Sequence, residues 1–126
     1  MVLGIGTDIV EIARVRKAVE SDRFRDRVYT EREQEYCQSR GMQAAASYAA
    51  RFSGKEAVLK AFGTGLRAGS LLDIEILPDE LGCPRVALSG YFAEKAAAMG
   101  ADRIHLSLSH ARDYATAQCI LEADRR

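Results

Sequence analysis

Two acidic residues lie in apolar surroundings along this chain. Asp8 comes near the end of a β-prone segment, Val2 to Val10, and Glu56 lies in the most apolar helical stretch. Carboxylates from separate elements are ligands that Mg²⁺ uses, with water and substrate phosphates completing its coordination. Each acid also has a structural explanation, Asp8 as a turn residue or helix cap and Glu56 as the partner of Lys60 in a surface ion pair. Together they predict a magnesium site, and structural roles are the alternative.

The residues that follow Glu56 favour phosphate binding. Lys60 precedes the sequence Gly63-Thr64-Gly65, where a glycine-rich backbone can approach a phosphate that the lysine ammonium neutralises. The spacing differs from that of a P-loop, in which the lysine and a hydroxyl residue open a helix. Gly63 and Gly65 are therefore candidate phosphate contacts, and an ordinary C-terminal helix cap is the alternative.

A third group of polar residues alternates with leucines near the C-terminus. On a strand, His105, Ser107 and Ser109 share one face, and Leu106 and Leu108 face the core. The imidazole and hydroxyl groups are suited to hydrogen-bonding a phosphate or a pantetheine-like amide chain, or they simply face solvent. Neither a nucleophile-elbow sequence nor a Cys or Ser with an evident base partner is present, which argues against covalent catalysis.

Periodicity and capping signals predict the elements that position these residues. We expect an α+β fold in which an antiparallel sheet packs with one long and several short helices. Thr30 and Glu33 form a capping box, residues 21–27 read as an irregular turn, and Gly4, Gly6 and Gly54 indicate close approach or bends. The predicted strands are Val2–Val10, Leu71–Leu77, Arg85–Leu88, Ile104–Ser109 and Tyr114–Leu121. The predicted helices are Ile12–Val19, Glu31–Arg40, Met42–Phe62 and Gly90–Met99, the last capped by Ser89.

Length and composition limit the classes of function. The chain has 126 residues, about the size of one common domain, so we expect a single domain over residues 1–126. Its 18 basic and 18 acidic residues cancel, which argues against nucleic acid or membrane partners captured by bulk charge. The sequence has neither a membrane-spanning apolar run nor a signal-peptide pattern, so we expect a cytoplasmic protein. We expect the three cysteines to be reduced, buried and inert.

Three sequence blocks together resemble the holo-[acyl-carrier-protein] synthase family, and their order and separations match over nearly the whole chain. The blocks are Gly4-Ile5-Gly6-Thr7-Asp8-Ile9-Val10-Glu11-Ile12 with Arg14, the run from Arg51 to Gly65, and His105-Leu106-Ser107-Leu108-Ser109-His110. The central block is the most specific, because it joins Lys-Glu-Ala, Lys-Ala and Gly-Thr-Gly at fixed spacing. Ser53-Gly54 and Leu81-Gly82-Cys83 depart from the pattern of many members, which have Ala-Ala and Asn-Gly-Lys.

The resemblance implies the phosphopantetheinyl transferase fold and a Mg²⁺-dependent transfer of 4′-phosphopantetheine from coenzyme A to a serine of apo acyl carrier protein. It implies a homotrimer whose sites lie at subunit interfaces, with His105 contributed by a neighbouring chain. The family's residues fall on Asp8 and Glu56 for the metal, Lys60 for the phosphate, and Arg51 and His105 for coenzyme A. We expect Ser107 to join the coenzyme A site. Glu56, directly or through a water, is the candidate general base.

The segment from Arg14 to Arg27 is the local basic patch that an acidic carrier protein requires. It holds six basic residues against three acidic ones, and we expect Arg14, Arg23 and Arg25 to dock the carrier. Two competing functions remain. One is a coenzyme A or nucleotide-binding module without catalysis, and the other is a Mg²⁺-dependent pyrophosphate hydrolase. The joint presence of Asp8, Glu56 and Lys60 argues against the first, and the basic segment argues against the second.

Overall fold

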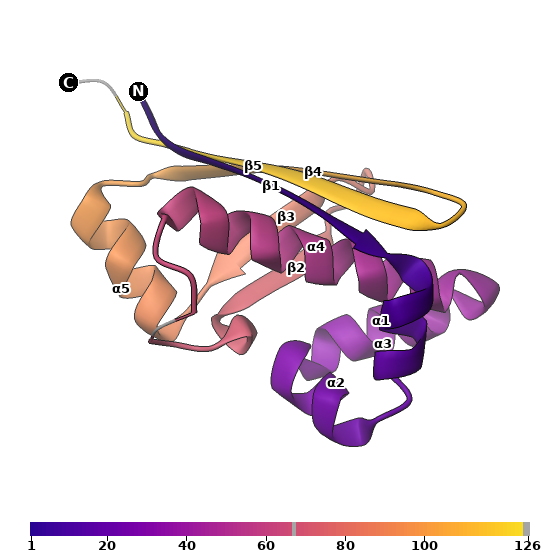
Figure 1. Cartoon of the computed structure of the whole chain (residues 1–126). Coiled ribbons are helices and arrows are strands. Elements are labelled where there is room, and N and C mark those ends of the chain that lie inside the picture. Colours follow the sequence, from indigo (N-terminus) through magenta and orange to yellow (C-terminus); the bar gives the residue numbers. More distant parts are fainter. Residues whose placement is uncertain (67, 125–126) are drawn as a thin grey trace.

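The architecture pairs two small antiparallel sheets with one long helix between them (Figure 1). The computed structural model describes residues 1–66 and 68–124. The strands are β1 (Val2–Glu11), β2 (Ile74–Pro78), β3 (Pro84–Leu88), β4 (Arg103–Ala111) and β5 (Tyr114–Glu122). The α-helices are α1 (Ile12–Ala18), α2 (Asp22–Val28), α3 (Glu31–Ser39), α4 (Ala44–Phe62) and α5 (Gly90–Met99), and two 3₁₀ turns are η1 (Gly41–Gln43) and η2 (Leu71–Asp73). This confirms the expected α+β class.

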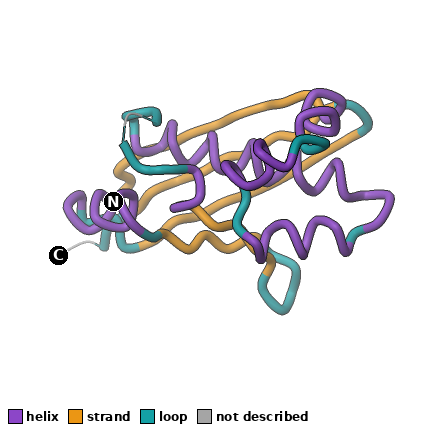
Figure 2. Tube along the Cα trace, turned by 90° about the horizontal axis from the view of Figure 1, so that it is seen from below, coloured by secondary structure: helices purple, strands orange, loops and turns teal. Residues whose placement is uncertain are grey.

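The larger sheet has the strand order β1-β5-β4, and β2 pairs with β3 in the smaller sheet. All pairings are antiparallel, and β4 and β5 form the predicted hairpin. The N-terminal strand and the C-terminal strand are neighbours, so both termini lie at the same end of the molecule (Figures 1 and 2). Within the described residues, no helix is long and apolar enough to span a membrane.

Helix α4 is buried along most of its length because small residues let both sheets approach it. A Cβ atom at Gly4 or Gly6 of β1 would lie 2.0 Å from the carbonyl oxygen of Ala61 or Ala57. A Cβ at Gly54 of the helix would lie 2.7 Å from Cδ1 of Ile76 on β2 and 3.1 Å from Cδ2 of Leu108 on β4. The predicted close approach is confirmed at these positions: the backbone of β1 lies directly against that of α4, and side chains of β2 and β4 pack against Gly54.

Most element ends lie within one or two residues of the prediction, and three differences have a physical cause. Residues 22–28 form a helix rather than an irregular turn, because Phe24 and Val28 lie four residues apart on its inner side and the Ser21 side chain caps it. The predicted strand at Leu71 begins only at Ile74, because a capping box between Ser70 and Asp73 folds η2 first. The long helix begins after η1 rather than at residue 42.

The capping signals were mostly correct. The Thr30–Glu33 capping box is present, and Gly63 and Gly100 end their helices in the left-handed conformation. Ser89 precedes α5 as predicted, but its side chain makes no capping hydrogen bond.

All three cysteines are free, and two of them are buried as expected. Cys37 and Cys119 lie in the core, whereas Cys83 is exposed in the turn between β2 and β3. The carboxylate of Asp79 accepts hydrogen bonds from the backbone N–H groups of Leu81 and Cys83, so this turn is organised at the surface rather than by packing.

Candidate functional site

Strand β1 and helix α4 bring Asp8 and Lys60 into contact. Asp8 follows Gly4 and Gly6 on the face of β1 that approaches the helix, and its side chain is only 12% exposed. Lys60 Nζ lies 3.1 Å from Asp8 Oδ1 and donates a second hydrogen bond to the Thr7 carbonyl. The lysine therefore pairs with Asp8, which differs from the surface pair with Glu56 that the helical spacing offered as an alternative.

Glu56 lies one helical turn before Lys60 and is half-buried. Burial raises the pKa of its carboxyl group, the negative charge of Asp8 raises it further, and Lys60 opposes this change. The two acids are thus close enough to interact electrostatically, as the sequence predicted. One lysine accompanies two carboxylates, so the cluster carries excess negative charge.

The second carboxylate oxygen of Asp8 has no protein partner. Asp8 Oδ2 is buried and accepts no hydrogen bond within the described part of the chain. Buried polar atoms are nearly always satisfied, and those that are not commonly face a ligand or ion. The donor set of Asp8 and Glu56 consists of hard oxygens, which fits Mg²⁺. Among the described residues no group of three or more His, Cys, Asp or Glu side chains could hold a metal, so water and substrate oxygens would complete the coordination.

The backbone that follows α4 is open beside this cluster. Gly63 and Gly65 have φ angles of 79° and 63°, and the space where their side chains would stand contains no protein atoms within 4 Å. The N–H of Gly63 bonds to the carbonyl groups of Leu59 and Lys60, so Gly63 is a helix cap, as the alternative proposed. Gly63 and Gly65 are exposed and lie about two helical turns or more beyond Glu56 in the chain.

Arg51 lies further toward the N-terminal end of α4, at the base of a second hollow. It is 6% exposed, and its guanidinium carbon lies 4.5 Å from the centre of the Tyr36 ring. One terminal nitrogen donates to Ser47 Oγ at 3.2 Å, but Nε is buried without a partner. The hollow has a volume of about 200 Å³, and Arg40 and His110 also line it. This combination of cationic groups and an unpartnered donor can bind an anion.

The two histidines lie on opposite faces of β4. His105 is exposed, and its Nε2 lies 2.9 Å from a Glu122 carboxylate oxygen, whose hydrogen bond lowers the pKa of Glu122. Within one chain His105 is not brought together with Arg51, whereas His110 is. The alternation that directed Leu106 and Leu108 inward also directs His110 inward, and this signal was missed in the sequence.

Ser107 occupies the outward face of the sheet with His105, as predicted. On this face His105 is aligned with Ile120 and Ile5 of the neighbouring strands. Ile5 is 71% exposed and Ile120 is 36% exposed. The outward face therefore mixes polar side chains with the exposed isoleucines Ile5 and Ile120.

The arginines of the basic segment differ in how far they are exposed and in whether they bond within the chain. Arg14 and Arg23 are exposed on α1 and α2. Arg25 is partly buried, and its guanidinium bonds to the Val19 carbonyl and pairs with Asp22, which ties the start of α2 to the end of α1. Of the three expected docking residues, two are available at the surface and the third has a structural role in joining the helices.

Comparison with known proteins identifies one family. The 4′-phosphopantetheinyl transferase superfamily matches residues 4–119. A holo-[acyl-carrier-protein] synthase of Ruminiclostridium cellulolyticum is 47% identical over 93% of this chain and 90% of its own length. The corresponding synthase of Clostridium novyi is 48% identical over 98% of this chain and 90% of its own length.

Solved structures of similar proteins have the same fold. The holo-[acyl-carrier-protein] synthase of Neisseria meningitidis superimposes with a TM-score of 0.89 at 33% identity, covering 97% of this chain and 99% of that one. A Bacillus anthracis synthase in complex with coenzyme A (3′,5′-ADP) gives 0.82 at 36% identity, over 98% of this chain and 99% of that one. The fold of β1, α4 and the β4–β5 hairpin is thus the fold of these enzymes.

Proposed function

The chain belongs to the holo-[acyl-carrier-protein] synthases of the 4′-phosphopantetheinyl transferase superfamily, and we propose that it transfers 4′-phosphopantetheine from coenzyme A to a serine of apo acyl carrier protein. The other product is adenosine 3′,5′-bisphosphate. The observation that carries this proposal is the pair of carboxylates from β1 and α4, with Asp8 Oδ2 buried and unpartnered. A diphosphate substrate with its metal supplies the group that this oxygen lacks.

Asp8 and Glu56 are the residues that would hold Mg²⁺. When bound, the ion supplies positive charge that stabilises the diphosphate and its leaving oxygen. Hard oxygen donors and the excess negative charge of the cluster support this assignment. Lys60, already directed at Asp8, supplies a second positive charge at the same place.

Transfer requires removal of a proton from the serine of the carrier protein. The serine oxygen forms a bond to the β-phosphorus of coenzyme A while the bond from that phosphorus to the bridging oxygen breaks. The leaving bisphosphate keeps the electron pair, and the serine proton passes to the Glu56 carboxylate, directly or through a water. Burial and the neighbouring Asp8 raise the pKa of Glu56, which strengthens it as a base.

Coenzyme A has a second anionic group, and the Arg51 hollow supports a place for it. The unpartnered Nε of Arg51 and the nearby His110 are suited to a phosphate. Gly63 and Gly65 would approach the diphosphate through their backbones. Crystal structures of synthases from Bacillus anthracis and Helicobacter pylori contain coenzyme A, which supports the same ligand here.

The outward face of the sheet supports a homotrimer with sites at its subunit interfaces. Exposed isoleucines such as Ile5 and Ile120 lose water on association, and His105 and Ser107 on the same face would then meet coenzyme A held by a neighbouring chain. We further propose a cytoplasmic enzyme that binds neither nucleic acid nor membrane. The three free cysteines are compatible with a reducing compartment.

The exposed arginines support docking of the acidic carrier. Arg14 on α1 and Arg23 on α2 can meet acidic side chains, whereas Arg25 is engaged within the chain. Arg14→Glu with Arg23→Glu should weaken the carrier interaction by about tenfold and leave coenzyme A binding unchanged, with a smaller effect at high salt. Isothermal titration with each ligand measures this. Equal weakening for both ligands would contradict the docking assignment.

The decisive experiment incubates the enzyme with coenzyme A, Mg²⁺ and apo acyl carrier protein and measures the mass of the carrier. We expect a gain of one phosphopantetheine group, which a chelator abolishes and added Mg²⁺ restores. No gain with a folded enzyme and a competent carrier would overturn the proposal. Cleavage of coenzyme A without a carrier would indicate the hydrolase instead, and binding without cleavage would indicate a module that has no catalytic activity.

A further inference from the structure

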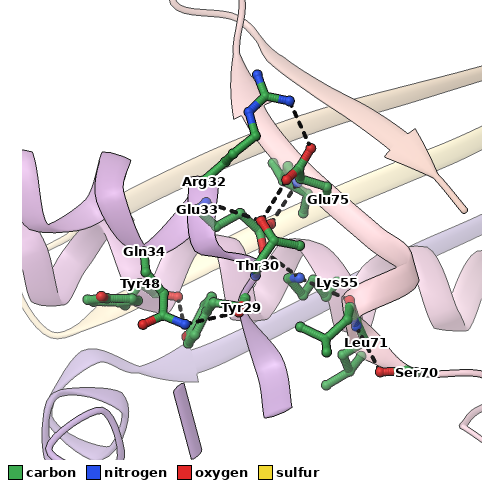
Figure 3. Close-up of polar contacts among 12 residues, drawn as sticks. Tyr29, Thr30, Arg32, Glu33, Gln34, Tyr48, Lys55, Ser70, Leu71 and Glu75 are labelled. Atoms are coloured by element: carbon green, nitrogen blue, oxygen red, sulfur yellow. Dashed lines mark hydrogen bonds and ion pairs between the residues drawn. The ribbon is translucent and has the colours of Figure 1, made fainter. Parts of the chain in front are cut away.

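An ion pair between α3 and α4 is entirely enclosed in the core. Lys55 Nζ lies 2.7 Å from Glu33 Oε1, and both side chains are 0% exposed. The same ammonium donates a hydrogen bond of 2.9 Å to the carbonyl oxygen of Leu71 in η2 (Figure 3). Lys55 thus connects the middle of α4 to the point where the chain returns after leaving that helix.

Glu33 holds the lysine in place and is itself fully bonded. Its Oε1 also accepts the backbone N–H of Thr30 at 2.9 Å, and its Oε2 accepts the backbone N–H of Ile76 at 2.7 Å (Figure 3). The network therefore joins α3, α4, η2 and β2 through two side chains. Each carboxylate oxygen has a donor, which is the condition under which a buried charge is tolerated.

The bond to Leu71 has a consequence beyond packing. The segment that carries Gly63 and Gly65 begins at the end of α4 and returns at η2, where Lys55 fixes it. Its return is stiffened by the Ser70–Asp73 capping box, and the N–H of Ser89 also bonds to the Asp73 carbonyl. Lys55 therefore holds the point at which the chain returns after the glycine segment, and Lys60 lies one turn before the start of that segment.

Stabilisation of the fold does not by itself explain why Glu33 and Lys55 are charged. Buried ion pairs are often replaced without loss of stability by apolar residues of similar volume, because desolvation offsets their attraction. Burial lowers the pKa of Lys55, which reflects this cost, and Glu33 opposes the change. The feature that an apolar pair would lack is the directed hydrogen bond to the Leu71 carbonyl.

We propose that Lys55, held by Glu33, is a positioning residue for coenzyme A: it fixes η2 so that the backbone from Gly63 to Gly65 is set beside the diphosphate. This inference rests on the proposed function. Lys55 does not touch the substrate and acts through the glycine segment. It differs in this from Lys60, whose ammonium is at the site itself.

The test compares the double variant Glu33→Gln/Lys55→Met with wild type and with Leu121→Ala. The double variant removes the charges together, so no unpaired buried ion remains and the fold is retained. The glutamine keeps one oxygen acceptor, which serves the N–H of either Thr30 or Ile76, and the methionine cannot donate to Leu71. Leu121 is 0% exposed on β5, outside this network, so Leu121→Ala lowers stability without affecting it.

We expect the double variant to raise the KM for coenzyme A by about two- to tenfold, the range spanned by one hydrogen bond, with kcat and the KM for the carrier changed less than about twofold. Amide hydrogen exchange from Gly63 to Leu66 should accelerate in the double variant and not in Leu121→Ala. Unchanged exchange, or a KM for coenzyme A equal to that of Leu121→Ala, would overturn the inference.

Failure of the proposed function gives a different pattern. If wild type neither binds coenzyme A in calorimetry nor modifies the carrier, the function is wrong and the positioning role falls with it, whatever the exchange data show. If wild type is active and the double variant has wild-type KM with unaltered exchange, the function stands and only the positioning role is rejected.

Discussion

Two neighbouring residues of α4 belong to charge clusters of opposite design. Lys55 enters a closed network in which every oxygen of its partner Glu33 is bonded. Glu56 faces an open cluster that contains a second carboxylate, a single lysine and an unbonded oxygen of Asp8. Both clusters are charged and at least partly buried, but they differ in whether every polar atom has a hydrogen-bond partner. We infer that a fully bonded cluster maintains the fold, whereas an unbonded oxygen such as Asp8 Oδ2 is suited to a ligand.

The electrostatics of the two clusters explain this difference. In the closed network one positive and one negative charge are both removed from water, and each compensates for the other. In the open cluster burial and the like charge of Asp8 raise the pKa of Glu56, and the single ammonium of Lys60 only partly opposes this change. The open cluster therefore keeps an unfavourable excess of negative charge, which the proposed cation would offset.

Asp8→Asn should produce the largest effect on activity. Loss of one metal carboxylate is expected to reduce transfer by at least about a hundredfold. The thermal midpoint should change little, because the substitution removes the repulsion with Glu56 together with the ion pair to Lys60. A carrier mass assay and a melting curve measure both, with Glu94→Gln on the exposed face of α5 as the control. Turnover within about threefold of wild type, well short of the effect of a lost electrostatic group, would remove Asp8 from the site.

Lys55→Met alone should produce the largest effect on stability. It leaves Glu33 as an uncompensated buried charge, so urea unfolding should show a loss of about 3–5 kcal/mol. Adding Glu33→Gln should recover most of this loss, since the double variant buries no charge. A double variant no more stable than the single one would mean that charge compensation is not what holds the closed network together.

The open cluster should respond to pH in the absence of metal. The pKa of Glu56 is raised in the fold, so the folded chain favours the protonated form, and this contribution to stability is lost as pH rises from the ordinary glutamate pKa through the raised one. Glu56→Gln cannot ionise and escapes the loss. Its thermal midpoint relative to wild type should therefore increase between pH 4 and pH 7, measured with a chelator present. A constant difference would contradict repulsion within the cluster.

The smallest expected effect is on the rate at which the cysteine thiols are labelled. This rate reports whether solvent reaches the core around the Glu33–Lys55 network. Burial raises the pKa of the Cys119 thiol to about 12 and that of Cys37 above its usual value, so both remain protonated and protected at pH 8. Cys83 is exposed and should take up one maleimide, which Cys83→Ser abolishes. In Lys55→Met, Cys37 should become slowly reactive. Equally fast labelling of all three thiols in wild type would show that the core opens readily.

The local features of this structure were predictable from the sequence. Capping residues such as Thr30 and Gly63 act within a few positions, and glycines such as Gly6 indicate close contact through their missing side chain. The pairing of Asp8 with Glu56 was predicted from the ligand chemistry of two carboxylates and supported by the family resemblance, although nothing in either segment alone specifies the other. Site assignments beyond this geometry remain predictions.

The parts that escaped prediction depend on tertiary context. The helix at residues 22–28 forms because two apolar residues find a core that the charged sequence does not reveal. The partner of Lys60 is 52 residues away rather than four, because β1 lies directly against α4. The Glu33–Lys55 pair likewise joins residues from different helices. Alternation along β4 did contain the signal for His110, and it was read no further than Leu108.

The distance between Asp8 and Glu56 depends on the absence of a side chain at Gly6, which lets β1 lie directly against α4. A methyl group at Gly6 would collide with a backbone carbonyl of α4, and a carbonyl in a helix has no rotamer by which to yield. The strand would have to tilt outward as a lever, and Asp8, two residues along on the same face, would travel with it. Gly6→Ala, which adds one uncharged carbon away from the carboxylates, is therefore expected to reduce activity as strongly as the loss of a carboxylate.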